Sequence, residues 1–139
     1  MINFTKLSPY ARIDNPAKKG DAGYDLYNYK NMITIYSHKL TAVSIGICIE
    51  IPEGYVGIIC EKSGLALNKG VQVMGGIIDS GYRGEITVII KNNLSVNLKL
   101  NPGDKIAQLL IVPCITPKLK EVKSLNQTER EGDGFGSTG

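Results

Sequence analysis

The sequence predicts an all-β fold in one compact domain. Its apolar stretches are short and rich in β-branched residues, they alternate with period two, and turn residues separate them. With 139 residues and 42% hydrophobic content, the chain can bury a core of its own. Many short strands at close spacing predict an antiparallel sandwich, a jelly roll or a barrel.

The predicted strands run from the first third of the chain almost to its end. They cover residues 33–36, 43–51, 55–59, 86–90, 95–100 and 106–115. Turns are expected at 52–54, 91–93 and 101–104, where Pro, Gly, Asn and Asp gather. Helix is expected only as a turn or two over 62–69, although Gly64 disfavours it.

The core is expected to be built from Ile, Val and Leu, because the chain has no Trp and only two Phe. Residues 106–112 are apolar on both predicted faces of their strand. One of these faces is therefore expected to pack against another subunit, which would make the chain an oligomer.

Charge and composition limit the expected partners. The net charge of +3 comes from scattered Lys and Arg, which favours small anionic ligands over nucleic acid. No segment approaches membrane-spanning length and no leader pattern is present, so we expect no membrane partner and an intracellular protein, cytoplasmic or nuclear. Cys48, Cys60 and Cys114 are expected to be reduced, buried thiols, without the spacing of a zinc site.

Asp79 is the candidate catalytic base. It lies between the apolar segment 76–78 and the turn at Ser80-Gly81, which would present its carboxylate beside Tyr82. A carboxylate there can orient and deprotonate a water that attacks phosphorus, and the Tyr82 ring can lie under a sugar. The alternative is an aspartate that caps its own turn, and for an isolated Asp-Ser-Gly it is the commoner case.

Three further positions can meet an anion or a metal. Lys62-Ser63-Gly64 follows a strand and can offer an ammonium, a hydroxyl and backbone N–H groups to a phosphate, or form a plain turn. Gln108 is polar within an apolar run, where its amide either satisfies the backbone or reaches a ligand. Asp25 is a possible partner of metal-bound water or a solvated turn carboxylate.

The C-terminal residues 130–139 are too rich in glycine to pack as helix or strand on their own. They carry a guanidinium, an aromatic ring and two hydroxyl groups, which suit an anion and a planar base. The sequence thus divides into a β domain over 1–129 and a flexible arm over 130–139, and the arm is expected to close over a bound nucleotide.

Five segments in fixed order resemble the five motifs of the trimeric dUTP pyrophosphatases, the dUTPases, over nearly the whole chain. They are residues 22–26, 62–66, 76–84, 103–109 and 130–139. The resemblance implies a jelly-roll-like, distorted-barrel subunit in a homotrimer with an exchanged C-terminal arm. It implies Mg²⁺-dependent hydrolysis of dUTP to dUMP and pyrophosphate, which limits uracil in DNA and supplies dUMP for dTMP synthesis.

The resemblance also implies a role for each matched residue. Asp79 would position the water that attacks the α-phosphorus, while Asp25 would touch Mg²⁺ only through water, because the substrate phosphates hold most of the metal. Tyr82 would stack beneath deoxyribose and exclude a 2′-hydroxyl. The remaining implied contacts are with uracil, through the main chain of Gly76, Ile77, Ile78 and Thr87 and the ring of Phe135, and with phosphates, through Lys62, Ser63, Gly64, Gln108, Arg130, Gly136, Ser137 and Thr138.

The chain departs from the family pattern at four positions. Lys62 stands where the family has Arg, Glu61 where it has Pro, and Glu131 where it has Gly. Lysine keeps the charge of arginine but loses its two-pronged hydrogen bonding. Val73 stands where many members have an Asn that faces the base.

Two alternatives share the fold. In the dCTP deaminases, including bifunctional forms, a catalytic Glu follows the Tyr-Arg-Gly turn, where this chain reads Thr87-Val88-Ile89-Ile90. Glu85 is close but falls at a different position, so the proton shuttle of deamination is missing. The second alternative is a nucleotide-sensing binding protein. Lys62 and Glu131 would favour it, whereas the presence of both the candidate base and the C-terminal arm argues against it.

Overall fold

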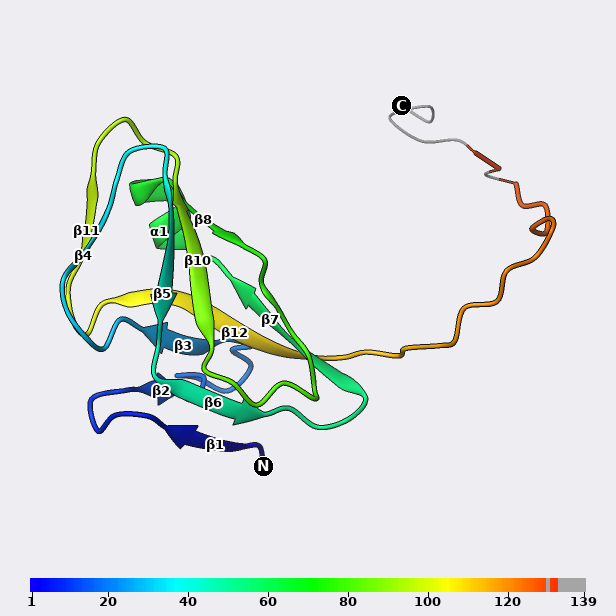
Figure 1. Cartoon of the computed structure of the whole chain (residues 1–139), viewed down its shortest axis with the longest axis horizontal. Helices are drawn as coiled ribbons and strands as arrows, with labels where there is room; N and C mark the ends of the chain where they lie inside the picture. Colours follow the sequence, from blue (N-terminus) through cyan, green and yellow to red (C-terminus); the bar gives the residue numbers. More distant parts are fainter. Residues whose placement is uncertain (130, 133–139) are drawn as a thin grey trace.

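The computed structural model describes residues 1–129 and 131–132 of the chain. The predicted arm residues Arg130, Phe135, Gly136, Ser137 and Thr138 lie outside this part. Regular structure in the described part consists of strands and one short helix (Figure 1). In chain order they are β1 (Asn3–Lys6), β2 (Ile13–Asp14), β3 (Tyr24–Tyr27), β4 (Ile33–Ile35), β5 (Leu40–Ser44), β6 (Ile47–Glu50), β7 (Tyr55–Cys60), α1 (Ser63–Lys69), β8 (Val71–Met74), β9 (Ile77–Ile78), β10 (Thr87–Asn92), β11 (Leu98–Leu100) and β12 (Lys105–Pro113).

The strands form four small antiparallel sheets. The largest has the order β2-β3-β12-β7-β9, and a second has the order β5-β10-β8. Two-stranded pairings of β1 with β6 and of β11 with β4 complete the arrangement. Within the described residues these sheets do not close into one continuous barrel, but together they enclose a single apolar cluster.

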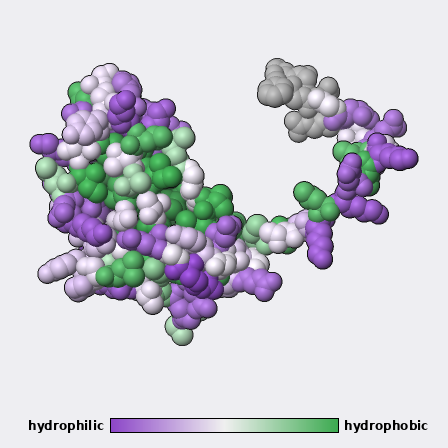
Figure 2. Space-filling model, viewed as in Figure 1, coloured by the Kyte–Doolittle hydropathy of each residue, from purple (hydrophilic) through white to green (hydrophobic). Residues whose placement is uncertain are grey.

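The core is aliphatic, as the composition predicts. Its fully buried side chains come from strands of all four sheets and from the segments that join them, so burial of Ile, Val and Leu ties the sheets together. The largest of them are Leu26, Ile35, Val43, Ile45, Ile47, Ile51, Ile86, Val88, Ile90, Leu100, Ile106 and Leu109. Figure 2 shows that apolar residues also gather on the displayed face of the body.

Strand β12 fits the prediction of a strand that is apolar on both faces. Ile106, Ala107 and Leu109 are buried in the core of the same chain, whereas Leu110 and Val112 are only partly covered. After β12 the chain leaves the body (Figure 1), and residues 115–129 are exposed throughout. The apolar surface that one chain leaves uncovered therefore includes the second face of its longest strand.

The structure corrects several predicted elements. The predicted strand 43–51 is two strands, because the chain bends at Gly46, whose φ of 71° favours glycine. The predicted turn at 91–93 is wrong, since β10 continues through Asn92. Only 98–100 of the predicted strand 95–100 is a strand, whereas the helix over 62–69 is confirmed as α1.

The three cysteines are free thiols, but none of them is fully buried as predicted. Cys48, Cys60 and Cys114 are all partly exposed. They lie on or next to strands with one face toward solvent, which apolar neighbours in the sequence did not reveal. In the described part of the chain, the structure contains no helix long and apolar enough to span a membrane.

Candidate active site

A row of polar residues crosses the five-stranded sheet. Asp14 on β2 lies opposite Asp25 on β3, Asp25 lies opposite Gln108 on β12, and Gln108 lies opposite Cys60 on β7. Directly opposed residues of antiparallel strands point to the same face of a sheet. The register therefore places Asp25 and Gln108, 83 positions apart in the sequence, side by side on one face.

Two lysines pair with Asp25. The ammonium group of Lys62, just before α1, contacts one carboxylate oxygen, and the Nζ atom of Lys105, at the start of β12, lies 2.6 Å from the other. Burial by itself would raise the pKa of Asp25, but the hydrogen bonds and charges of Lys105 and Lys62 outweigh it and hold the pKa below its ordinary value. The same contact raises the pKa of Lys105. The carboxylate is thus ionised at neutral pH.

Gln108 is held in one orientation by its surroundings. Its Nε2 atom donates to the carbonyl oxygen of Glu61 at 2.8 Å, while its Oε1 atom lies so close to Gly23 that any Cβ there would overlap it. A side chain at position 23 would therefore displace the Gln108 amide from this orientation. One N–H of the Gln108 amide is used by Glu61, and the second is available for a ligand oxygen.

These side chains border two hollows at the surface. The first, of about 350 Å³, is lined by Lys62, Ser63, Gly64, Leu65, Asn68, Lys69, Lys105 and Gln108. The second, of about 540 Å³, is lined by Ala17, Asp21, Ala22, Gly23, Asp25, Lys62, Lys105, Gln108 and Leu110. Lys62, Lys105 and Gln108 belong to both, so the two hollows meet at a wall that offers two cations and an amide. This wall suits an anion that carries several negative charges.

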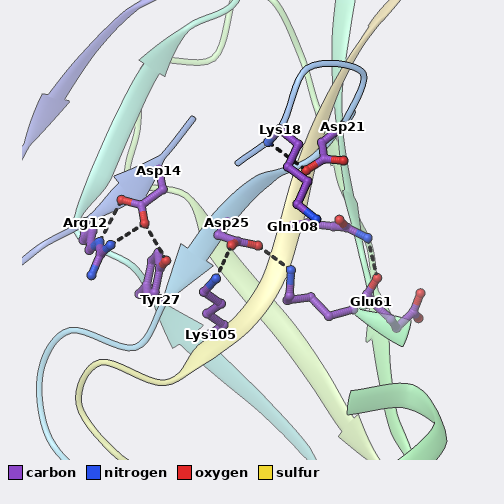
Figure 3. A network of polar contacts seen from close by, with 10 residues as sticks. Arg12, Asp14, Lys18, Asp21, Asp25, Tyr27, Glu61, Lys105 and Gln108 are labelled. Atoms are coloured by element: carbon purple, nitrogen blue, oxygen red, sulfur yellow. Dashed lines mark hydrogen bonds and ion pairs between the residues drawn. The ribbon is translucent and has the colours of Figure 1, made fainter. Parts of the chain in front are cut away.

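A second polar cluster, formed by Arg12, Asp14 and Tyr27, lies at the β2 end of this row of opposed residues (Figure 3). Arg12 binds Asp14 through Nε at 2.7 Å and through a second guanidinium nitrogen, and the buried Tyr27 donates its hydroxyl to Asp14 at 2.7 Å. Hydrogen bonding to Arg12 and Tyr27 lowers the pKa of Asp14. The Nζ atom of Lys105 lies 5.9 Å from the centre of the Tyr27 ring, so this ring also contacts the lysine that pairs with Asp25.

Asp79 follows β9 directly, at the start of the turn that carries Tyr82. Both residues are exposed in the single chain, and the N–H of Tyr82 donates to the carbonyl of Asp79 at 3.0 Å. No side-chain hydrogen bond from the Asp79 carboxylate to its own turn is present in the described residues. The carboxylate of Asp79 is thus presented to solvent at the end of a strand.

The ring of Tyr82 is folded back over its own turn. Its hydroxyl donates to the carbonyl of Glu85 at 3.0 Å, and a Cβ at Gly84 would collide with the ring and the hydroxyl. Arg83 fixes the same turn by donating to the carbonyls of Ser80 at 2.6 Å and Tyr82 at 2.9 Å. Glycine at 84 therefore allows the position of the Tyr82 ring.

The chain changes sheets at Gly75-Gly76. Strand β8 pairs with β10 up to Met74 opposite Ile89, whereas β9 pairs with β7. Continuing the β8–β10 register places Gly76 opposite Thr87. The carbonyl of Gly76 accepts the N–H of Ile59 at 2.7 Å, and Gly75 has a φ of 60°. Beyond this point β9 and β10 diverge, so the backbone of Ile77 and Ile78 has no strand partner on the β10 side in the described part.

One chain does not bring all predicted site residues together. The register of β9 with β7 places Asp79 next to Val56, whereas Gln108 lies opposite Cys60. Four residues of extended strand separate these rows by roughly 13 Å. The structure therefore groups Asp25, Lys62, Ser63, Gly64 and Gln108 at one place, and Asp79 and Tyr82 at another.

Sequence reasoning missed three residues of the site. Lys105 lines both hollows and pairs with Asp25, Glu61 holds the Gln108 amide, and Tyr27 supports Lys105. Their positions depend on strand pairing, for which the sequence has no local signal. Only Lys105 has an indication in the sequence, because it lies three residues before Gln108 in the same matched segment.

The structure also shows what Glu85 does. Its carboxylate accepts the N–H of Gly46 at 2.7 Å and is partly buried there. This contact joins the turn after Tyr82 to the bend between β5 and β6. The carboxylate is thus engaged by the backbone in a structural role.

Comparison with known proteins identifies a family. The sequence profile of the dUTPase family matches residues 9–139. The deoxyuridine 5'-triphosphate nucleotidohydrolase of Swinepox virus (strain Kasza) is 42% identical over 139 residues, which cover 99% of this chain and 96% of the viral protein.

Two solved structures of dUTPases are similar over most of their length. The Staphylococcus bacteriophage 80alpha dUTPase with dUPNHPP superposes with a TM-score of 0.89 at 29% identity, covering 100% of this chain and 98% of that one. A mutant dUTPase of phage phi11 of S. aureus, described with a structural Mg(II) ion, gives a TM-score of 0.82 at 29% identity, covering 89% and 97%. Because the family profile matches residues 9–139 and the viral relative is 42% identical over 99% of the chain, the chain belongs to the dUTPase family.

Proposed function

We propose that the protein hydrolyses dUTP to dUMP and pyrophosphate by attack of water on the α-phosphorus. The observation that carries this proposal is the grouping of Lys62, Lys105 and Gln108 around Asp25 on one wall, in a chain of the dUTPase family. The wall provides the charge that a triphosphate needs and a carboxylate that a divalent cation prefers.

The phosphate chain binds along this wall. Lys62 and Lys105 supply positive charge, Gln108 donates its free amide N–H, and Ser63 and Gly64 line the hollow at the start of α1. Both lysines are paired with Asp25 in the free protein, so a bound triphosphate competes with Asp25 for them. The triphosphate of the substrate thus takes the place of the Asp25 carboxylate as the partner of the two lysines.

Magnesium fits this place, because Asp25 offers hard oxygen ligands at the edge of the phosphate-binding hollow. In our proposal the three phosphate groups would supply most ligands of the ion, and Asp25 would contact it through water. When bound, the ion neutralises charge that develops on the phosphates during hydrolysis.

Asp79 acts as the base in this proposal. Its carboxylate is exposed at a strand end, where it can accept a proton from the attacking water. The Tyr82 ring, fixed by its bond to Glu85 and by Gly84, lies under deoxyribose and excludes a 2′-hydroxyl. Uracil binds the backbone of Gly76, Ile77, Ile78 and Thr87 where β9 and β10 diverge, since fixed donors and acceptors there reject cytosine.

The separation of the two groups within one chain supports a site made of several copies. If Asp79 of one copy lies beside Lys62 and Gln108 of another, these residues can share one site even though they are separated along β7 within each chain. The uncovered face of β12 offers apolar surface for such an assembly. We propose a homotrimer in which Arg130, Phe135, Gly136, Ser137 and Thr138 of the 130–139 arm close over the nucleotide.

Product analysis tests this function. Purified protein and Mg²⁺ are incubated separately with dUTP, dCTP, dTTP and UTP, and the products are separated by chromatography. The proposal predicts dUMP and pyrophosphate from dUTP and little turnover of the other three. Ammonia from dCTP would instead indicate a deaminase, and tight dUTP binding without turnover would indicate a nucleotide sensor.

A further inference from the structure

Glu61 joins three elements of the site. It follows β7 directly, its carboxylate oxygen Oε1 accepts the N–H of Val73 on β8 at 2.7 Å, and its main-chain carbonyl accepts the Gln108 amide on β12 at 2.8 Å. Its neighbour Lys62 pairs with Asp25 on β3. Two adjacent residues thus connect the end of β7 to three other strands.

The contact with Val73 connects the end of β7 to the outer edge of β8. Strand β8 is the last strand of its sheet and uses its other edge to pair with β10. The Glu61 carboxylate therefore satisfies an edge N–H of β8 that no strand pairs with in the described part.

Besides the bonds of Glu61 and the pairing of Lys62 with Asp25, few contacts among the described residues fix the segment between β7 and α1. Helix α1 begins without a side-chain cap, and the carbonyl of Lys62 accepts its first backbone bonds, from Leu65 and Ala66. Ser63 and Gly64 are exposed, and, apart from its chain neighbours and the backbone of α1, no atom of residues 1–129 or 131–132 lies within 4 Å of the missing Cβ of Gly64. The direction in which Lys62 leaves the sheet consequently depends on the residue before it.

We propose that Glu61 is a positioning residue for phosphate binding. Its carboxylate fixes the end of β7 by accepting a hydrogen bond from Val73, and this bond holds both Lys62 and the carbonyl that orients Gln108. The Glu61 carboxylate is directed at β8, and Glu61 lines neither of the two hollows. The inference rests on the proposed function, because it concerns the same phosphate-binding wall.

The test compares Glu61→Ala with Glu61→Gln, which keeps an oxygen acceptor for the Val73 N–H. A matched control is Glu53→Ala, an exposed glutamate in the turn before β7. Steady-state kinetics with dUTP, inhibition by deoxyuridine, and calorimetric binding of inorganic triphosphate are measured for the wild type and for the three variants. Melting temperatures are recorded in parallel.

We expect Glu61→Ala to raise the KM for dUTP and the Kd for inorganic triphosphate by about tenfold, the effect of one lost hydrogen bond to a charged group. Inhibition by deoxyuridine should not change, because it has no phosphates. Glu61→Gln and Glu53→Ala should stay within about twofold of the wild type.

Two results would overturn the inference. One is an Ala variant that melts at a lower temperature but keeps its KM and triphosphate affinity, which would make Glu61 purely structural. The other is a Gln variant as impaired as the Ala variant. A wild-type protein that does not hydrolyse dUTP would reject the proposed function instead, and triphosphate binding would still decide the role of Glu61.

Discussion

The carboxylate of Asp25 pairs with the ammonium group of Lys62, which joins the middle of β3 to the loop that precedes α1. The side chains are 16% and 30% exposed, so water screens this pair only in part. Lys105 binds the other carboxylate oxygen at 2.6 Å. In the free protein, the two lysines that border both hollows are therefore held by an internal anion.

This arrangement predicts how stability depends on pH. The pKa of Asp25 is lowered in the folded protein, so the ion pairs contribute fully above the ordinary aspartate value of about 4, and their contribution is lost as pH falls through the lowered value. Asp25→Asn should therefore reduce the free energy of unfolding by roughly 2 kcal/mol at pH 7, and the difference should shrink below about pH 4. Urea unfolding of both proteins from pH 7 to pH 3 measures it, and a difference that does not depend on pH would contradict the pairing.

The close approach of the Tyr82 ring to Gly84 predicts that adding one methyl group at position 84 changes the preference for deoxyribose. Gly84→Ala places a methyl group against the Tyr82 ring, and overpacking of this kind costs about 1–3 kcal/mol. We expect the preference for dUTP over UTP, measured as a ratio of kcat/KM, to fall roughly tenfold. Gly81→Ala is the matched control, because nothing lies near the missing Cβ of Gly81. Equal effects of both substitutions would argue against a steric role of Gly84.

Asp79 is expected to act in catalysis and not in binding. Asp79→Asn keeps the size of the side chain but removes the proton acceptor, so kcat should fall by about 10²–10⁴-fold. Calorimetry with a non-hydrolysable dUTP analogue should give a Kd close to that of the wild type. A parallel loss of affinity would mean that Asp79 holds the substrate.

The separation of Asp79 from Lys62 within one chain predicts complementation between inactive variants. Asp79→Asn and Lys62→Met should each have low activity, whereas co-expressed, differently tagged chains purified as mixed assemblies should regain part of it. In such an assembly an intact Asp79 from one copy can meet an intact Lys62 from another. Mixed assemblies as inactive as their parents would show that each site uses a single chain, and assemblies of one variant with both tags provide the control.

Much of this fold is predictable from the sequence, and the reasons for the failures are physical. Alternation reveals β7, β10 and β12, whose residues face the core on one side, and the short helix follows Lys62 as expected. Strand β1 is exposed at all four residues, so it has no alternation to detect, and β2 has only two residues. These strands form because β6 and β3, which lie far from them in the sequence or across a long loop, supply their hydrogen bonds.

The candidate site was predictable in its residues but not in its geometry. Asp25, Lys62 and Gln108 were all singled out, and the structure brings them together because strand pairing places Asp25 opposite Gln108 and Lys62 pairs with Asp25. The placement of Lys105 and the two hydrogen bonds of Glu61 arise from contacts between segments far apart in the chain. Such contacts leave no periodic pattern in the sequence.

Hydrolysis of dUTP in water enriched in ¹⁸O tests the central claim most directly. If water attacks the α-phosphorus, mass spectrometry should find one ¹⁸O atom in dUMP and none in pyrophosphate. Label in pyrophosphate would place the attack at the β-phosphorus and contradict the account, and so would a protein that binds dUTP and releases no product.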